Sequence, residues 1–360
     1  MAKKKSGWLE ALAGAGLEVK SARDALQVKG FLDTGCYALN WAISGRLLGG
    51  YPLGHCGEIF GDPSTGKSFL AARAIAMMQA AGGLALLDDA EGAYNAEHSI
   101  VLGVDVDTLG YARSRTVKQH LDATVSFTTA LRAMNQSGIL VLDSLAQLST
   151  DHEMESKLDK RDMSKAAELK AFYRIVGGDI FDLPMVHLAT NHTIAAIGNM
   201  FQKRTTGGGG GPKYTSSWRL DMRATSKIKD GTEVVGMIVR AVVDKNRIAT
   251  PFKEVRLAIP FHQPISKASG LIALLTSLGV LEERGNFLFY QGTKLGRAYK
   301  DTNKEKFLVQ DEMGEALLDQ YPEILEEADA LIAAGQTKRP VAATTSEEAA
   351  DDDDEDGAAE

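Results

Sequence analysis

The chain has 360 residues, of which 44% are hydrophobic and 24% are charged, a composition typical of a globular protein with a substantial core. No apolar run approaches the ~20 residues that span a bilayer, and the first residues lack the apolar segment of a secretory signal. Its two cysteines, Cys36 and Cys56, form no metal-type cluster and are typical of a reducing compartment. We therefore expect a cytoplasmic protein without a membrane partner, in the host cytoplasm if a phage encodes it.

The net charge of −8 is concentrated at one end of the chain. Residues 347–360 hold nine acidic residues and no Lys or Arg, and the remaining 39 acidic residues nearly balance the 40 basic ones. A block of like charges repels itself and cannot be buried, so we expect residues 336–360 to be a disordered tail. The acidity of the whole chain therefore does not exclude a nucleic-acid partner.

In chain order, a helical stretch within residues 6–27 and an extended piece at 28–33 come first. From residue 35 to about 265, short apolar runs alternate with helical ones, as in parallel strands covered by helices on both faces. The strands expected in this region are residues 57–60, 84–88, 110–113, 138–143 and 185–190. The pattern predicts an α/β domain with a central parallel sheet.

Two longer alternating runs follow, at residues 218–228 and 233–243. The Asp-Gly pair between them is a hairpin signal, so we expect antiparallel strands added to the parallel sheet. Residues 266–335 are expected to form a small C-terminal α+β domain, with helices within 268–279 and 311–335.

The phrase GDPSTGKS, residues 61–68, lies between an expected strand and the helical run at 69–81. It matches G-x-x-x-x-G-K-[S/T], in which backbone N–H groups and the start of the helix bind phosphate oxygens. Lys67 is expected to bridge the terminal phosphates and the Ser68 hydroxyl to ligate Mg²⁺. The residues expected to hold the nucleotide here are Gly61, Asp62, Pro63, Ser64, Thr65, Gly66, Lys67, Ser68 and Phe69.

Acidic residues follow two of the expected strands. Asp143 ends the run ILVLD and is expected to be the second anchor of the magnesium ion. The strand at 84–88 ends at Asp88, with Asp89 and Glu91 just beyond it, and by position any of the three could orient the water that attacks the γ-phosphate. We favour Glu91 because it stands clear of the strand.

With GDPSTGKS, DDAEG and LVLDS in this order, the chain resembles the RecA-type recombinase family up to about residue 335. The resemblance implies a RecA-like P-loop ATPase core at residues 35–265, with ATP and Mg²⁺ as cofactors. It selects Glu91 as the residue that activates water. It also implies that residues 1–34 are an oligomerisation element that packs on the next subunit of a filament.

Three further positions take their meaning from this resemblance. His192, in ATNHTI, stands where bacterial members have a glutamine that senses the γ-phosphate; with the later run of five glycines it looks like the phage branch typified by UvsX. Lys245 and Arg247, in DKNR, match basic residues that reach the ATP of the adjacent subunit, which would couple hydrolysis to assembly. His98 falls where bacterial members have a tyrosine on adenine, although an exposed helical histidine fits equally well.

Two stretches are expected to bind single-stranded DNA. The glycine-rich stretch at 198–218 lets its backbone approach phosphates closely, and cations flank it. Its expected contacts are Met200, Phe201, Lys203, Arg204, Gly207, Gly208, Gly209, Gly210, Gly211 and Lys213. In the stretch at 150–170 they are Lys160, Arg161 and Met163. Arg223 and Arg240 match a weaker site for incoming duplex, although a solvated strand face explains them almost as well.

The sequence thus predicts an ATP-dependent recombinase that forms helical filaments on single-stranded DNA and pairs it with homologous duplex DNA. A hexameric replicative helicase shares the nucleotide core and is the main alternative. A regulator that binds ATP without turnover is a third, which the intact Lys67, Glu91 and Asp143 disfavour. A single-strand-binding protein and a loader are expected partners.

Overall fold

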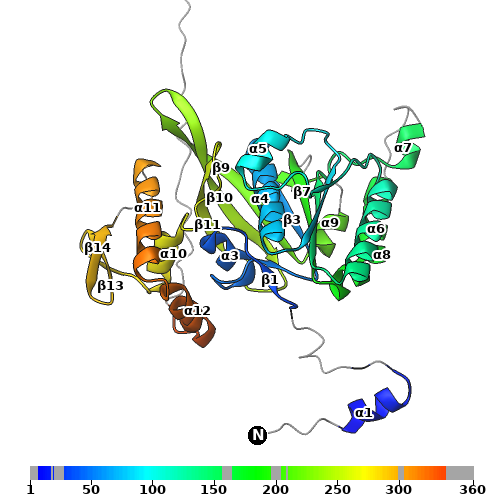
Figure 1. The fold of residues 1–360 in the computed structure, drawn as a ribbon, viewed down its shortest axis with the longest axis horizontal. Coiled ribbons are helices and arrows are strands. Elements are labelled where there is room, and N and C mark those ends of the chain that lie inside the picture. The colour runs from blue at the N-terminus through cyan, green and yellow to red at the C-terminus, as the bar shows by residue number, and fades with distance from the viewer. Residues whose placement is uncertain are drawn as a thin grey trace, which may run out of the picture.

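The computed structural model describes residues 7–17, 19, 28–155, 164–195, 204–207, 210–298 and 304–337. One large sheet organises most of them (Figure 1). Its strands lie in the order β11-β10-β9-β3-β7-β6-β4-β5. Its strands are β3 (His55–Gly61), β4 (Leu84–Asp89), β5 (Gly110–Ala112), β6 (Gly138–Asp143), β7 (Met185–Ala195), β9 (Trp218–Asp230), β10 (Glu233–Asn246) and β11 (Glu254–Pro260). The short β8 (Arg204–Thr206) pairs with the end of β7, and β1 (Phe31–Leu32) pairs with β2 (Tyr51–Pro52).

The register of the parallel strands places functional positions at one edge of the sheet. All pairs from β9 to β5 are parallel, whereas β10 and β11 are antiparallel additions. Pairing of β3 with β7 sets Gly61 beside His192, and pairing of β4 with β6 sets Asp89 beside Asp143. Because parallel strands all end at the same edge, the segments that follow them can form one site.

Helices cover both faces of this sheet. Successive residues of β6 belong to different buried clusters, Ile139 and Val141 to one and Leu140 and Leu142 to the other, because side chains alternate between the faces of a strand. The helices of this part are α3 (Tyr37–Ser44), α4 (Lys67–Ala80), α5 (Ala96–Val101), α6 (Val117–Met134), α7 (Asp151–Glu155), α8 (Ser164–Asp182) and α9 (Gly210–Thr215). Residues of α3 and α4 belong to the first cluster and residues of α6 and α8 to the second.

The C-terminal unit packs against the same core. It contains α10 (Leu271–Leu278), β12 (Glu282–Arg284), β13 (Phe287–Tyr290), β14 (Thr293–Arg297), α11 (Lys304–Gln320) and α12 (Ile324–Ala334). Leu275 and Ile324 lie in one buried cluster with Leu39 of α3. The carboxylate of Asp329 accepts hydrogen bonds from the backbone N–H groups of Leu47 (2.6 Å) and Leu48 (3.0 Å).

The structure confirms the five predicted parallel strands and the hairpin, and adds elements that the sequence patterns did not reveal. β11 was not predicted, and the strands β12, β13 and β14 of the expected α+β domain had not been located in the sequence. The helical stretch at 311–335 is two helices, since Pro322 lies at their junction and cannot continue a helix. Of the N-terminal stretch, α1 (Gly7–Gly14) is helical, while residues 20–27 and the tail from 338 lie outside the described residues. No helix within the described residues is long and apolar enough to cross a membrane.

Candidate nucleotide-binding site

The loop between β3 and α4 has the conformation that its glycines permit. Ser64 and Gly66 both have left-handed backbone conformations, with φ of 60° and 88°. A Cβ added at Gly66 would lie 2.7 Å from Cδ1 of Ile259, and one at Gly61 would lie 2.3 Å from the carbonyl oxygen of Met222. The loop therefore excludes side chains at both positions and leads directly into the N-terminus of α4, where backbone N–H groups favour an anion.

Lys67 places a cation inside this loop. Its side chain is 6% exposed, and Nζ donates hydrogen bonds to the carbonyl oxygens of Gly61 (3.1 Å) and Asp62 (2.8 Å). Burial lowers the pKa of Lys67, while the carboxylates of Asp143 and Glu91 act in the opposite direction. A buried ammonium surrounded by acceptors is well placed to bind terminal phosphates of a nucleotide.

Asp143 and Ser68 form an oxygen-rich pair next to Lys67. Burial raises the pKa of Asp143, and the negative charge of Glu91 raises it further. Hydrogen bonds to its carboxylate from the hydroxyls of Thr190 and Ser68 act in the opposite direction. A carboxylate and a hydroxyl are ligands that Mg²⁺ accepts, with water and phosphate oxygens completing its shell. The donor set fits, and Ser68 and Asp143 are the residues that would hold the ion.

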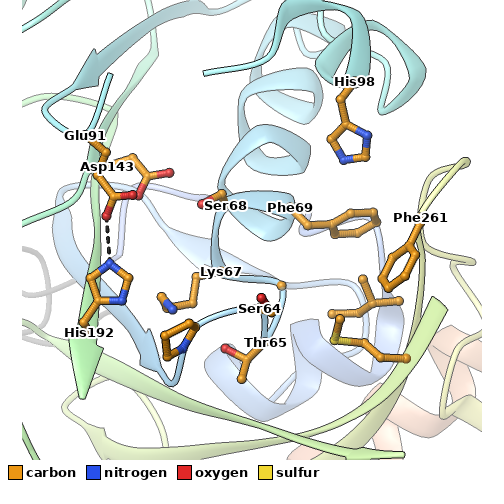
Figure 2. Close-up of a pocket in the computed structure, with 14 residues that line it drawn as sticks. Ser64, Thr65, Lys67, Ser68, Phe69, Glu91, His98, Asp143, His192 and Phe261 are labelled. Atoms are coloured by element: carbon orange, nitrogen blue, oxygen red, sulfur yellow. Dashed lines mark hydrogen bonds and ion pairs between the residues drawn. The ribbon is translucent and has the colours of Figure 1, made fainter. Parts of the chain in front are cut away.

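Glu91 is held by two donors at the opposite side of the cavity from the phosphate loop. Its Oε1 is 2.8 Å from Nε2 of His192 (Figure 2). The same oxygen is 2.6 Å from the hydroxyl of Ser144. Burial favours a raised pKa for Glu91, but the hydrogen bonds from Ser144 and His192 and the charge of Lys67 outweigh it and lower the pKa overall. Because an ionised carboxylate only accepts hydrogen bonds, Nε2 of His192 carries the proton between them.

The three acids at the end of β4 and just beyond it have different surroundings. Asp88 is fully buried, and its carboxylate is 2.7 Å from Nδ1 of His120 and accepts the backbone N–H of Ser114. Asp89 accepts several backbone N–H groups of the following turn and closes it. Glu91 alone of the three lines the cavity that contains the phosphate loop. The geometry thus places Glu91 at the cavity and gives the other two structural partners.

The cavity of about 500 Å³ has a polar end and an apolar end. Its polar lining comes from the phosphate loop, Glu91, Asp143 and His192. Its apolar lining is Phe69, Met237, Ile259 and Phe261, with His98 of α5 close to the ring of Phe69 (Figure 2). Sequence reasoning missed three of the lining residues, which are Met237 of β10, Ile259 of β11 and Phe261 directly after β11. The alternating run that forms β11 could have indicated a strand, but its place beside the phosphate loop depends on the pairing of β10 with β9 and β11.

A buried polar network lies beside this cavity and was also missed. Nε of Arg219 is 2.6 Å from Oε2 of Glu58, and the amide of Asn191 donates to Oε1 of Glu58 (2.8 Å) and to the carbonyl oxygen of Gly207 (3.0 Å). Nη2 of Arg219 donates to the hydroxyl of Thr206 (3.1 Å). Asn191, the residue directly before His192, is therefore hydrogen-bonded to Gly207, the first residue of the glycine run.

Lys245 and Arg247 lie away from this chain's own cavity. Nζ of Lys245 donates to the carbonyl oxygens of Lys213 and Tyr214 (both 2.8 Å), and Nη2 of Arg247 also donates to Tyr214 (2.7 Å). Burial lowers the pKa of Lys245 to about 8. Neither residue lines the cavity, so the structure does not bring them to the nucleotide site of the same chain.

A comparison with known protein families identifies the family of this chain. The family model described as the RecA N-terminal domain matches residues 13–266. The chain belongs to the RecA family. The match confirms the predicted RecA-like α/β core, which the parallel sheet and its phosphate loop display.

Curated RecA proteins resemble this RecA-family chain over most of its length. It is 33% identical over 328 residues to Protein RecA of Bacteroides thetaiotaomicron, covering 91% of this chain and 94% of that protein. Protein RecA of Chloroherpeton thalassium is 34% identical over 291 residues, 80% of each chain. Protein RecA of Chlorobaculum parvum is 35% identical over 283 residues, 78% of this chain and 79% of that protein. The placement in a phage branch stays a prediction.

The structure describes only part of the predicted DNA-binding set of this RecA-family chain. Lys160, Arg161, Met163, Met200, Phe201, Lys203, Gly208 and Gly209 lie outside the described residues, as does the side chain of Arg204. Gly210 and Gly211 begin α9, which also carries the exposed Lys213. Arg223 pairs with Asp221 and Arg240 with Glu254, both at 2.6 Å. The two arginines predicted to receive duplex DNA thus have carboxylate partners within the sheet.

Proposed function

We propose that this RecA-family chain is a DNA-dependent ATPase that forms helical filaments on single-stranded DNA and exchanges strands with homologous duplex DNA. One observation carries the proposal. A single cavity brings together the phosphate loop with Lys67, the pair Ser68 and Asp143, and the ionised Glu91 bound to His192. These are the groups that ATP binding and hydrolysis require.

Within the cavity, the loop N–H groups and Lys67 bind the phosphates while Phe69 and Phe261 contact the base. When bound, Mg²⁺ supplies positive charge to the phosphate oxygens. The carboxylate of Glu91 accepts a hydrogen bond from the attacking water and orients it toward the γ-phosphorus, and it can take the proton as the P–O bond forms and the bond to the ADP oxygen breaks. Its lowered pKa keeps it ionised for this task.

His192 is the proposed sensor of the γ-phosphate. Its ring is hydrogen-bonded to Glu91, and its backbone N–H donates to the side chain of Asn191 (2.9 Å), which contacts Gly207. A phosphate that attracts the imidazole N–H away from Glu91 would thus act on the residue that holds the start of the glycine run. This arrangement supports a link between the nucleotide and the glycine-rich stretch that we propose to grip DNA.

Lys245 and Arg247 are proposed to act on the ATP of a neighbouring copy, since they lie outside the cavity of their own chain. Cations supplied across an interface neutralise charge in the transition state only in the assembled filament. We include in the proposal a position in the phage branch, which His192 and the five glycines support, and a single-strand-binding protein and a loader as partners.

The test is ATP hydrolysis without DNA, with duplex and with single-stranded DNA, for the wild type and Glu91→Gln. We expect single-stranded DNA to stimulate the wild type, and Glu91→Gln to lower the rate by about 10²–10⁴-fold while retaining filaments with ATP in electron microscopy. Glu97→Gln makes the same chemical change in the first turn of α5 and should keep the wild-type rate. Closed rings on DNA would favour a helicase and overturn the proposal.

A further inference from the structure

A separate polar cavity is lined in part by Ala90, the residue directly before Glu91. Its volume is about 420 Å³, within the size range of ligand sites. It is lined by Ala90, Arg113, Arg115, Gln147, Ser149 and Met154, which we call the arginine cavity. None of these residues has a role in the nucleotide site described above.

The lining of the arginine cavity suits an anion that offers several oxygen acceptors. Arg113 and Arg115 supply guanidinium groups, Gln147 an amide and Ser149 a hydroxyl, and no carboxylate lines the cavity. Across the part of the chain that the structure describes, neither guanidinium forms an ion pair or a hydrogen bond. Arginine binds phosphate oxygens through parallel N–H groups, so this donor set points to a phosphate group.

The position of Arg113 depends on Gly92. A Cβ added at Gly92 would lie 2.3 Å from Nη2 and 2.8 Å from Cζ of Arg113, so any larger residue there would displace the guanidinium. The nearby carboxylate of Asp89 accepts the N–H groups of Gly92 and Tyr94 and the hydroxyl of Tyr111. Arg113 therefore packs on the turn before α5, and its guanidinium forms neither a hydrogen bond nor an ion pair with the described carboxylate of Asp89.

The cavity also touches the segment after β6. The backbone N–H of Ser149 donates to the carbonyl of Arg115 (2.9 Å), and that of Val117 donates to the carbonyl of Ser149 (3.0 Å). These bonds fix the two arginines next to the segment that leads into α7. α7 lies at the beginning of the stretch 150–170, which is expected to contact DNA. A ligand in the cavity would thus contact this segment and Ala90, the neighbour of Glu91, at the same time.

We propose that the arginine cavity binds backbone phosphates of single-stranded DNA and transmits this binding to Glu91. A phosphodiester chain presents successive phosphates, which matches a pair of guanidiniums in one open cavity. Phosphate bound to Arg113 acts on the turn at Gly92, which directly follows Glu91. The inference rests on the proposed function and adds to it a binding site outside the two stretches predicted from sequence.

The test uses the full chain with Arg113→Gln, Arg115→Gln, the double variant and the conservative Arg113→Lys. ATP hydrolysis is measured against the concentration of an oligothymidylate at several salt concentrations, relative to the DNA-free rate of each variant. We expect each Gln variant to raise the half-stimulating DNA concentration about tenfold and to reduce the salt slope by about 0.7. Arg113→Lys should recover part of the loss because it restores the charge.

Lys118→Gln is the matched control, since Lys118 is an exposed cation of α6 that does not line the cavity. It should behave as the wild type. The inference is wrong if the double variant matches Lys118→Gln in half-stimulating concentration and salt slope, or if it loses filament assembly with unchanged DNA affinity, as expected of a contact between copies. A wild type that DNA does not stimulate would instead contradict the proposed function itself. Urea unfolding midpoints equal to that of the wild type verify that the variants are folded.

Discussion

The ion pair between Arg219 and Glu58 offers the sharpest test of the packing beside the nucleotide cavity. The side chains are 4% and 0% exposed, and their closest atoms are 2.6 Å apart. The guanidinium also lies over the ring of Phe60, 4.3 Å from its centroid. Arg219→Met keeps an unbranched side chain against Phe60 but removes the charge. Glu58 is then left buried with the amide of Asn191 as a remaining donor.

The expected cost follows from this burial. Removing one partner of a buried ion pair leaves an uncompensated charge, so Arg219→Met should lower the free energy of unfolding by about 3–5 kcal/mol. Arg132 and Asp179 form a pair at the same distance of 2.6 Å, but their side chains are 45% and 42% exposed. Because water screens such a pair, Arg132→Met should cost only about 0–1 kcal/mol. The two variants share the chemical change and the distance, and differ in burial.

The assay is urea unfolding followed by circular dichroism, with the double variant Glu58→Leu/Arg219→Met as a third protein. Because the double variant leaves neither charge buried alone, it should be more stable than Arg219→Met. The reasoning is refuted if Arg219→Met costs no more than Arg132→Met. A double variant as unstable as Arg219→Met would show that the loss comes from the other contacts of Arg219, with Thr206 and Asp244, rather than from an isolated Glu58.

Two further predictions concern the cavity itself. Ser144→Ala removes a hydrogen bond that lowers the pKa of Glu91, so this pKa should rise. Because activity is present above the pKa of Glu91 and lost as pH falls through it, the acid limb of kcat/KM should move to higher pH. An unmoved limb would mean that another group sets it. Phe261→Ala should raise KM for ATP about tenfold with little change in kcat, because the base loses an aromatic contact in both ground and transition states. Phe252→Ala, at a side chain 75% exposed and outside the cavity, should not change KM; equal effects would contradict the assignment.

Local sequence was sufficient for the phosphate loop and the strands that frame it. The spacing of Gly61, Gly66 and Lys67 can be recognised without knowledge of any distant contact, because the loop and the helix that follows are contiguous in the sequence. The continuous apolar run before Asp143 likewise predicted a buried parallel strand, and β6 has the same bounds as the prediction. The acids at and beyond the end of β4 were found by position, although position alone could not separate Glu91 from Asp88 and Asp89.

The tertiary structure decided which of these residues meet. His192 reaches Glu91 because β7 lies between β3 and β6, and β11 supplies an apolar wall because β9 and β10 continue the sheet beyond β3. Glu58 and Arg219 are 161 positions apart in the sequence and form an ion pair because β3 pairs with β9. Hydrophobic periodicity indicates that a strand is buried but not which strand lies beside it, since any apolar strand can pair with another through identical backbone groups. The order and register of the strands depend on the packing of the whole core. They place the predicted phosphate loop, Glu91, His192 and the residues of β11 around one cavity.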